Sequence, residues 1–220
     1  MVRQFETIFD TVSVVVLFEP KDRTRFGIDL DQKAIEELED ALDGTLRVTQ
    51  GVDGLLAISI PRHNLELTVA INRIEVRSLN PEFSDAVGER MIRLLRSIFE
   101  KLEISSLRSI GHNFVITLSK EKGSSAKLIE SRLIKTGLGK KTHYEVLGAA
   151  ASLWLKVEES TLLLKFEPHR NSMTSNRYSA NANFSVDFSD ETELPDANVT
   201  VDLMVKYCRR LQTILKDLGI

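Results

Sequence analysis

The strictest alternation of hydrophobic and polar residues lies between residues 177 and 188. One parity holds Tyr178, Ala180, Ala182, Phe184, Val186 and Phe188, and the other holds Arg177, Ser179, Asn181, Asn183, Ser185 and Asp187. Successive side chains of a strand point to opposite faces, so this pattern predicts a strand with one face on a core and one face in water. The β-branched run at residues 12–18 instead predicts a central strand that is buried on both faces.

The remaining periodicity predicts more strands and four helices. Strands are expected at 45–49, 55–60, 113–118, 144–147, 149–157 and 162–166. Residues 65–79 read as extended, with a change of phase near Asn72 that implies a bulge or a tight turn. Helical spacing of apolar residues predicts helices at 31–42, ending at Gly44, at 84–102, at about 125–134, and at 200–218 with Thr200 as its cap.

The order of these elements repeats along the chain. Each half reads as a strand, a helix, several antiparallel strands and a long helix, and residues 95–104 match residues 211–220 at four positions. The sequence therefore predicts an α+β fold, in which an antiparallel sheet carries helices on one face. We expect two related halves, residues 1–105 and 106–220, packed as one compact domain; two separate subdomains are the alternative.

A resemblance to a known family rests on the middle and the end of the chain. The segment 80–83, the long helix after it, the run from Ser106 to Asn113 that contains Arg108, the hairpin at 153–166 and the terminal amphipathic helix carry it. In these features the chain resembles an uncharacterised, sporadically distributed prokaryotic family whose members are slightly longer. The resemblance implies a duplicated α+β fold, and it implies no known activity.

Composition excludes several classes of protein. The chain has 220 residues, of which 42% are hydrophobic and 28% charged, so a disordered or coiled-coil protein is not expected. A single cysteine, Cys208, excludes an intrachain disulfide framework. No apolar stretch is long enough to cross a membrane, and acids occur early in the N-terminal segment, which is unlike a secretory signal. We expect a soluble cytoplasmic protein.

Charge is unevenly distributed, although the net charge is only −3. Residues 29–43 carry seven acids and one lysine, whereas residues 120–141 carry seven bases and two acids. That basic patch consists of Lys120, Lys122, Lys127, Arg132, Lys135, Lys140 and Lys141. Two solvated helix faces explain the pattern most simply. Alternatively, the two segments pair within the chain or between the chains of a homodimer, or the basic patch binds nucleic acid, which the net charge disfavours.

Established catalytic motifs are missing from the sequence. The four histidines, His63, His112, His143 and His169, are too widely spaced for a zinc site, and we expect them at the surface. Cys208 reads as a small buried residue rather than a nucleophile. The Gly- and Lys-rich segment at 135–142 lacks the first glycine and the Ser or Thr of a phosphate-binding loop. We therefore expect no metal and no cofactor, and the sequence favours a protein without catalysis of its own.

The polar parity of residues 177–187 is the best candidate binding surface. Short amides and hydroxyls in a row suit hydrogen bonding better than simple solvation, and Trp154 and Lys156 can join them if their strand shows the same face. The candidate residues are Trp154, Lys156, Arg177, Ser179, Asn181, Asn183 and Asp187. Burial of Trp154 under a loop is the competing interpretation.

These observations predict a binding or protein-interaction module, with another protein or a second copy of the chain as its partner. The alternative is an enzyme of unrecognised class, with a site assembled from Asp187, His112 and His169. Nucleic-acid binding through the basic patch is the second alternative.

Overall fold

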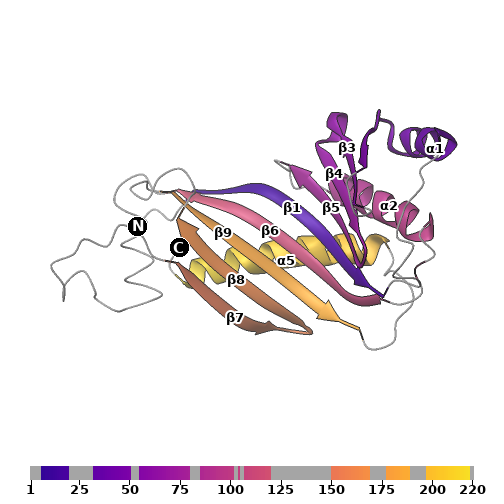
Figure 1. Ribbon diagram of the computed structural model, residues 1–220. Coiled ribbons are helices and arrows are strands. Elements are labelled where there is room, and N and C mark those ends of the chain that lie inside the picture. Colours follow the sequence, from indigo (N-terminus) through magenta and orange to yellow (C-terminus); the bar gives the residue numbers. More distant parts are fainter. Residues whose placement is uncertain are drawn as a thin grey trace, which may run out of the picture. The chain divides into compact units, whose positions relative to one another are not determined.

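The computed structural model describes residues 6–19, 32–50, 55–79, 85–101, 104, 107–119, 150–168, 177–188 and 197–218 (Figure 1). They form an antiparallel sheet in the order β2-β3-β4-β5-β1-β6-β9-β8-β7, with three α-helices, so the α+β class is confirmed. The elements are β1 (Glu6–Phe18), α1 (Gln32–Leu42), β2 (Arg47–Gln50), β3 (Leu56–Ile60), β4 (Leu65–Ala70), β5 (Arg73–Leu79), α2 (Asp85–Lys101), β6 (Leu107–Ser119), β7 (Ala151–Val157), β8 (Ser160–Pro168), β9 (Arg177–Asp187) and α5 (Ala197–Asp217). No helix among these residues is long and apolar enough to cross a membrane.

The chain divides into two compact units. The first unit comprises Thr11–Asn113 and Ser185–Lys206, and the second comprises Met1–Asp10, Phe114–Phe184 and Tyr207–Ile220. Strands β1, β6 and β9 and helix α5 contribute residues to both units. Each unit is described by itself below.

The core of the first unit is built from rows of paired apolar side chains. One row runs through Ile58, Leu67, Val76 and Val14, which face one another across β3, β4, β5 and β1 and are all buried. Helix α2 packs against β5 and β4 (Figure 1) through its own buried stripe. That stripe consists of Met91, Ile92, Leu94, Leu95, Ile98 and Phe99. Helix α1 in turn contacts α2.

Aromatic contacts form the core of the second unit. The ring of Phe184 on β9 stacks on Tyr207 of α5, with ring centroids 4.5 Å apart. Phe114 meets Phe184 edge-on at 6.0 Å, and Phe9 meets Phe114 at 6.2 Å. On β8 the buried apolar residues are Leu162, Leu164 and Phe166, which share the inward parity of the strand. Helix α2 in the first unit and helix α5 in the second thus each pack on one face of the sheet. We call the other face, on which no described helix packs, the open face.

Several predictions from periodicity are confirmed. Strand β1 is the middle strand of the sheet, and Val12 to Val16 are buried. The change of phase at Asn72 is a tight turn between β4 and β5 rather than a bulge. Strand β9 covers Arg177–Asp187 and buries Tyr178, Ala180, Ala182 and Phe184.

Other boundaries differ from the prediction. Strand β6 begins at Leu107 rather than at Asn113, and α5 begins at Ala197, so Thr200 lies inside the helix and does not cap it. Helix α1 ends before Asp43, and it is Asp43, not Gly44, that adopts the left-handed conformation, with φ 49°. The helix predicted near 125–134 and the strand at 144–147 lie outside the described residues.

His112 contradicts the expectation that the histidines lie at the surface. It is 0% exposed on the inward parity of β6, between the buried residues Ile110 and Phe114. Burial lowers the pKa of His112 from 6.5 to about 4, because desolvation disfavours the charged imidazolium. The side chain is therefore a neutral part of the core at pH 7. The strand expected at 113–118 leaves out residue 112, whereas β6 begins at Leu107 and includes it.

Gly88 of α2 lies against Val201 of α5 within the first unit. A Cβ at Gly88 would lie 3.1 Å from Cγ2 of Val201, which leaves little room for a side chain. We predict that Gly88→Leu lowers the free energy of unfolding by about 1–3 kcal/mol, the usual cost of overpacking. Chemical denaturation measures this, with Ala86→Leu on an exposed position of the same helix as control. Equal stability of the two variants would contradict this packing, and adding Val201→Ala should restore part of the loss.

The depressed pKa of His112 predicts a pH dependence of stability. Between pH 6.5 and 4 the unfolded state binds a proton that the folded state does not, so stability falls as pH falls through this window. A difference of two to three pKa units corresponds to about 3 kcal/mol. Urea unfolding of the wild type and of His112→Gln at pH 7 and pH 4 should show a smaller loss in the variant. Identical losses would mean that His112 does not titrate as described.

Candidate functional site

The polar row of β9 lies on the open face, as its alternation predicts. Asn183, Arg177 and Asp187 are exposed, whereas Ser179 and Asn181 are partly buried. Their inward neighbours on the strand are buried, namely Tyr178, Ala180, Ala182 and Phe184. Arg177, Ser179, Asn181 and Asn183 belong to the second unit, whereas Asp187 belongs to the first.

Trp154 lies on the open face of the second unit. Leu153 and Leu155 of β7 pair with the buried residues Leu164 and Leu162 of β8 and therefore share the inward face with them. Trp154 pairs with Leu163 on the opposite face, and it is 71% exposed. The described residues therefore do not bury Trp154 under a loop. Trp154, Lys156 and the polar residues of β9 that belong to the second unit are on the same side of the sheet.

The hairpin that joins β7 to β8 fixes this orientation. Val157 pairs with Ser160 across a loop of two residues, and Glu158 adopts a left-handed conformation with φ 53°. The Ser160 hydroxyl donates to the carbonyl of Val157 at 2.8 Å, and Nζ of Lys156 donates to the carbonyl of Glu159 at 3.1 Å. A two-residue loop sets the register of a hairpin, so it also decides which face each side chain occupies.

A charged cluster on the open face of the first unit was not among the predicted site residues. On β5, the carboxylate of Glu75 accepts hydrogen bonds from Nη2 of Arg73 at 2.7 Å and from Nη2 of Arg77 at 3.0 Å. Glu75 is 9% exposed, whereas both arginines are partly open to solvent. The alternation Arg-Ile-Glu-Val-Arg was the available signal, since Ile74 and Val76 mark the inward parity.

The structure separates the residues suggested for an enzymatic site. His112 points into the core on β6, while Asp187 is exposed on the polar parity of β9. Their strand parities place them on opposite faces of the sheet. His169 lies outside the described residues. The described part of the chain therefore does not bring Asp187 and His112 into one site.

Cys208 is buried, as predicted. Burial raises the pKa of its thiol to about 11, and the charge of Arg209 opposes this shift to a smaller extent. The thiolate is the reactive form of cysteine, so a thiol with a raised pKa is a poor nucleophile at neutral pH. Cys208 is a core residue of α5.

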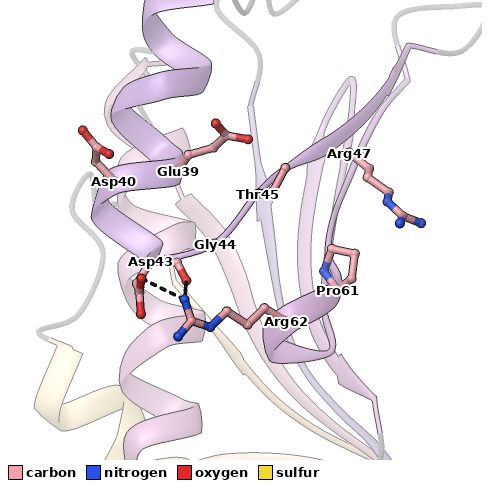
Figure 2. A pocket seen from close by; sticks show the side chains of 8 residues that line it. All are labelled: Glu39, Asp40, Asp43, Gly44, Thr45, Arg47, Pro61 and Arg62. Carbon is pink, nitrogen blue, oxygen red and sulfur yellow. Dashed lines mark hydrogen bonds and ion pairs between the residues drawn. The ribbon is translucent and has the colours of Figure 1, made fainter.

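A surface hollow of about 690 Å³ lies in the first unit, where α1 meets β2 (Figure 2). It is lined by Glu39, Asp40, Asp43, Gly44, Thr45, Arg47, Pro61 and Arg62. Figure 2 shows Arg62 reaching toward Asp43 at the end of the helix, while Arg47 points away from that pair. The three acids come from the acidic segment 29–43 that the sequence singled out.

The contacts in this hollow explain the local chain path. Nη1 of Arg62 donates to Oδ1 of Asp43 at 2.9 Å and to its carbonyl at 3.1 Å, and Nε2 of His63 lies 3.2 Å from the same carbonyl. The amide of Leu46 donates to Oε1 of Glu39 at 2.7 Å. The bonds to Asp43 satisfy the carbonyl group directly after α1, where a helix C-terminus leaves carbonyls without intrahelical partners, and the bond from Leu46 ties the chain after the helix to Glu39 of α1. The hollow is thus a structural junction between α1, β2 and the turn at residue 62.

Two residues of the run from Ser106 to Asn113 also make structural contacts. The Arg108 guanidinium donates to the carboxylate of Glu19, with 2.8 Å between Nε and Oε1, and the Arg108 carbonyl accepts from the amide of Phe188 at 2.8 Å. Nδ2 of Asn113 donates to the hydroxyl of Ser13 at 3.3 Å. The bonds of Arg108 link β6 to the ends of β1 and β9, and the bond of Asn113 links β6 to the middle of β1.

Other predicted features are not placed by the structure. The basic patch at 120–141 lies outside the described residues, as does His143. Among the residues that are described, no group of histidine, cysteine, aspartate and glutamate is suited to hold a metal ion.

Comparison with known proteins adds little to this picture. No family model and no curated protein matches the sequence. Among solved structures, the chain is similar to Methanococcus jannaschii TBP over 97% of each chain, with 14% sequence identity and a TM-score of 0.30. A similarity at that score supports no conclusion about the fold or the function of this chain.

Proposed function

We propose that this protein is a binding module that contacts a protein partner through the open face of its sheet. The exposure of Trp154 carries the proposal. A tryptophan that is 71% exposed on a regular strand leaves a large apolar surface in water, and such surfaces often mark interaction sites. Tryptophan is also among the residues that contribute most to binding energy at interfaces.

The surroundings of Trp154 support this proposal. Leu163 lies directly opposite on β8 and is only partly buried, so the indole has an apolar neighbour. Exposed Lys156 and Lys165 lie on the same face, and hydroxyl and amide side chains follow on β9. An apolar centre with a polar border is the usual composition of an interface. These features support recognition of a protein surface without catalysis by this chain.

We also propose that the fold arose from two related halves, with the boundary predicted near residue 105. The strand order supports it, because β1 and β6 adjoin at the centre and β5, β4 and β3 on one side correspond to β9, β8 and β7 on the other. The closing helices show matching details. The hydroxyls of Ser97 in α2 and Thr213 in α5, at aligned positions, donate to the carbonyls of Arg93 and Arg209 at 3.0 and 3.1 Å.

The two rival functions remain predictions. An enzyme would need a site other than the pair Asp187 and His112, since these residues lie on opposite faces. Nucleic-acid binding would depend on the basic patch, which lies outside the described residues. No described feature favours either rival over the interaction module.

The proposal predicts that Trp154→Ala abolishes partner binding without affecting the fold. Affinity capture from a native-like lysate at several salt concentrations should recover a partner with the wild type, and Trp154→Ala should lose it. Because the side chain is exposed, the free energy of unfolding should change by less than about 0.5 kcal/mol.

Val199→Ala is the matched control, since Val199 is an exposed apolar residue on α5. It should retain the partner. Recovery of the same proteins by the wild type and by Trp154→Ala, or recovery of no partner at any salt concentration, would contradict the proposed function.

A further inference from the structure

Strand β7 is an end strand of the sheet. It pairs with β8 on one side, and no described strand pairs with it on the other. An edge strand presents a row of main-chain donors and acceptors that can pair with a further strand. We propose that two copies of this chain pair through their β7 strands, antiparallel and about a twofold axis, to form a homodimer.

The two ends of the sheet differ in their capacity for such pairing. At the other end, β2 has four residues and begins with the exposed Arg47. Short and charged edges are typical of strands that avoid further pairing. Strand β7 has seven residues and a single charge, that of Lys156. Its inward residues Leu153 and Leu155 are only half-buried, and Trp154 on the open face is exposed, so both faces of β7 still present apolar surface.

The hairpin determines which main-chain groups face outward. The pair that closes a two-residue hairpin is a hydrogen-bonded pair, and such pairs alternate along an antiparallel ladder. Val157 and Ser160 close this hairpin, so Leu155 and Leu153 also direct their main-chain groups toward β8. The amides and carbonyls of Ser152, Trp154 and Lys156 then point to the outer edge.

A twofold axis at Trp154 makes this edge complementary to itself. The hydrogen-bonded pairs are then Trp154 with the partner's Trp154, and Ser152 with the partner's Lys156, twice. These three pairs provide about six main-chain hydrogen bonds. The only charge of each strand faces a neutral serine, so no like charges oppose each other across the axis. On the inward face, Leu153 meets the partner's Leu155, which covers the half-buried leucines.

This dimer goes beyond the proposed function and does not require it. The two indoles would lie side by side on the open face, which would become continuous between the two copies. A second copy is the occupant that fits best, because the pairing opposes no like charges and matches leucine with leucine. A different extended peptide, or another part of the same chain, would not depend on the pairing of Ser152 with Lys156.

A charge-swap series tests the register. Sedimentation equilibrium should show a dimer for the wild type, and Ser152→Lys should raise its dissociation constant by about tenfold or more, because two lysine pairs then face each other. The double variant Ser152→Lys with Lys156→Ser should restore the wild-type constant. Thr49→Lys, at an exposed position on β2, is the matched control and should have no effect.

Amide hydrogen exchange supplies the second readout. The amides of Ser152, Trp154 and Lys156 should be protected in the wild-type dimer and should exchange rapidly in the monomeric Ser152→Lys variant. A wild-type monomer at every concentration would overturn the proposal, whether its outer amides exchange or are covered from within the chain. A dimer that Ser152→Lys does not weaken would overturn it too. Retention of a captured partner by Ser152→Lys, which keeps Trp154, separates this result from the proposed function.

Discussion

Packing of helices α2 and α5 on only one face of the sheet is the constraint on which the other features of this protein depend. The rows of paired residues such as Ile58, Leu67 and Val76 exist because α2 covers that side in the first unit. In the second unit the stacking of Phe184 on Tyr207 has the same role. Since side chains alternate along a strand, every residue fixed in these cores commits its neighbours to the open face. The surface available for binding is therefore a consequence of how the core is packed.

This constraint explains why the polar groups on the open face differ from those of an ordinary solvated strand. Glu75 is nearly buried there and keeps both carboxylate oxygens bonded to Arg73 and Arg77. Within the second unit, the Thr117 hydroxyl donates to Oδ2 of Asp10 at 2.7 Å. Polar groups that are buried are costly unless they are hydrogen-bonded, and these groups are. The open face thus carries fixed polar groups in each unit, and in the second unit it also carries the apolar surface of Trp154.

The sequence predicted what depends on local alternation, and it failed where neighbours in space decide. The alternation of apolar and polar residues along β9 correctly predicted which face of the strand is buried, because it continues over all eleven residues. The face of Trp154 could not be predicted, since it depends on the pairing of β7 with β8. His112 shares the parity of Phe114, but the strand predicted from the sequence starts at residue 113 and so does not include it. The cluster around Glu75 was visible as alternation, yet only the structure shows that the glutamate is nearly buried between the two arginines.

The proposed binding function requires that the face that carries Trp154 is open to solvent. Because Trp154 is the only tryptophan, fluorescence excited selectively at tryptophan reports this side chain alone. Acrylamide quenching of that fluorescence, measured at high dilution and in the absence of any partner, is the most direct test. If the indole of Trp154 is exposed, the emission will lie at long wavelength and the quenching constant will be close to that of an exposed indole in a small peptide. Short-wavelength emission that resists the quencher at every dilution would show that the face around Trp154 is covered, and it would contradict the proposed binding surface.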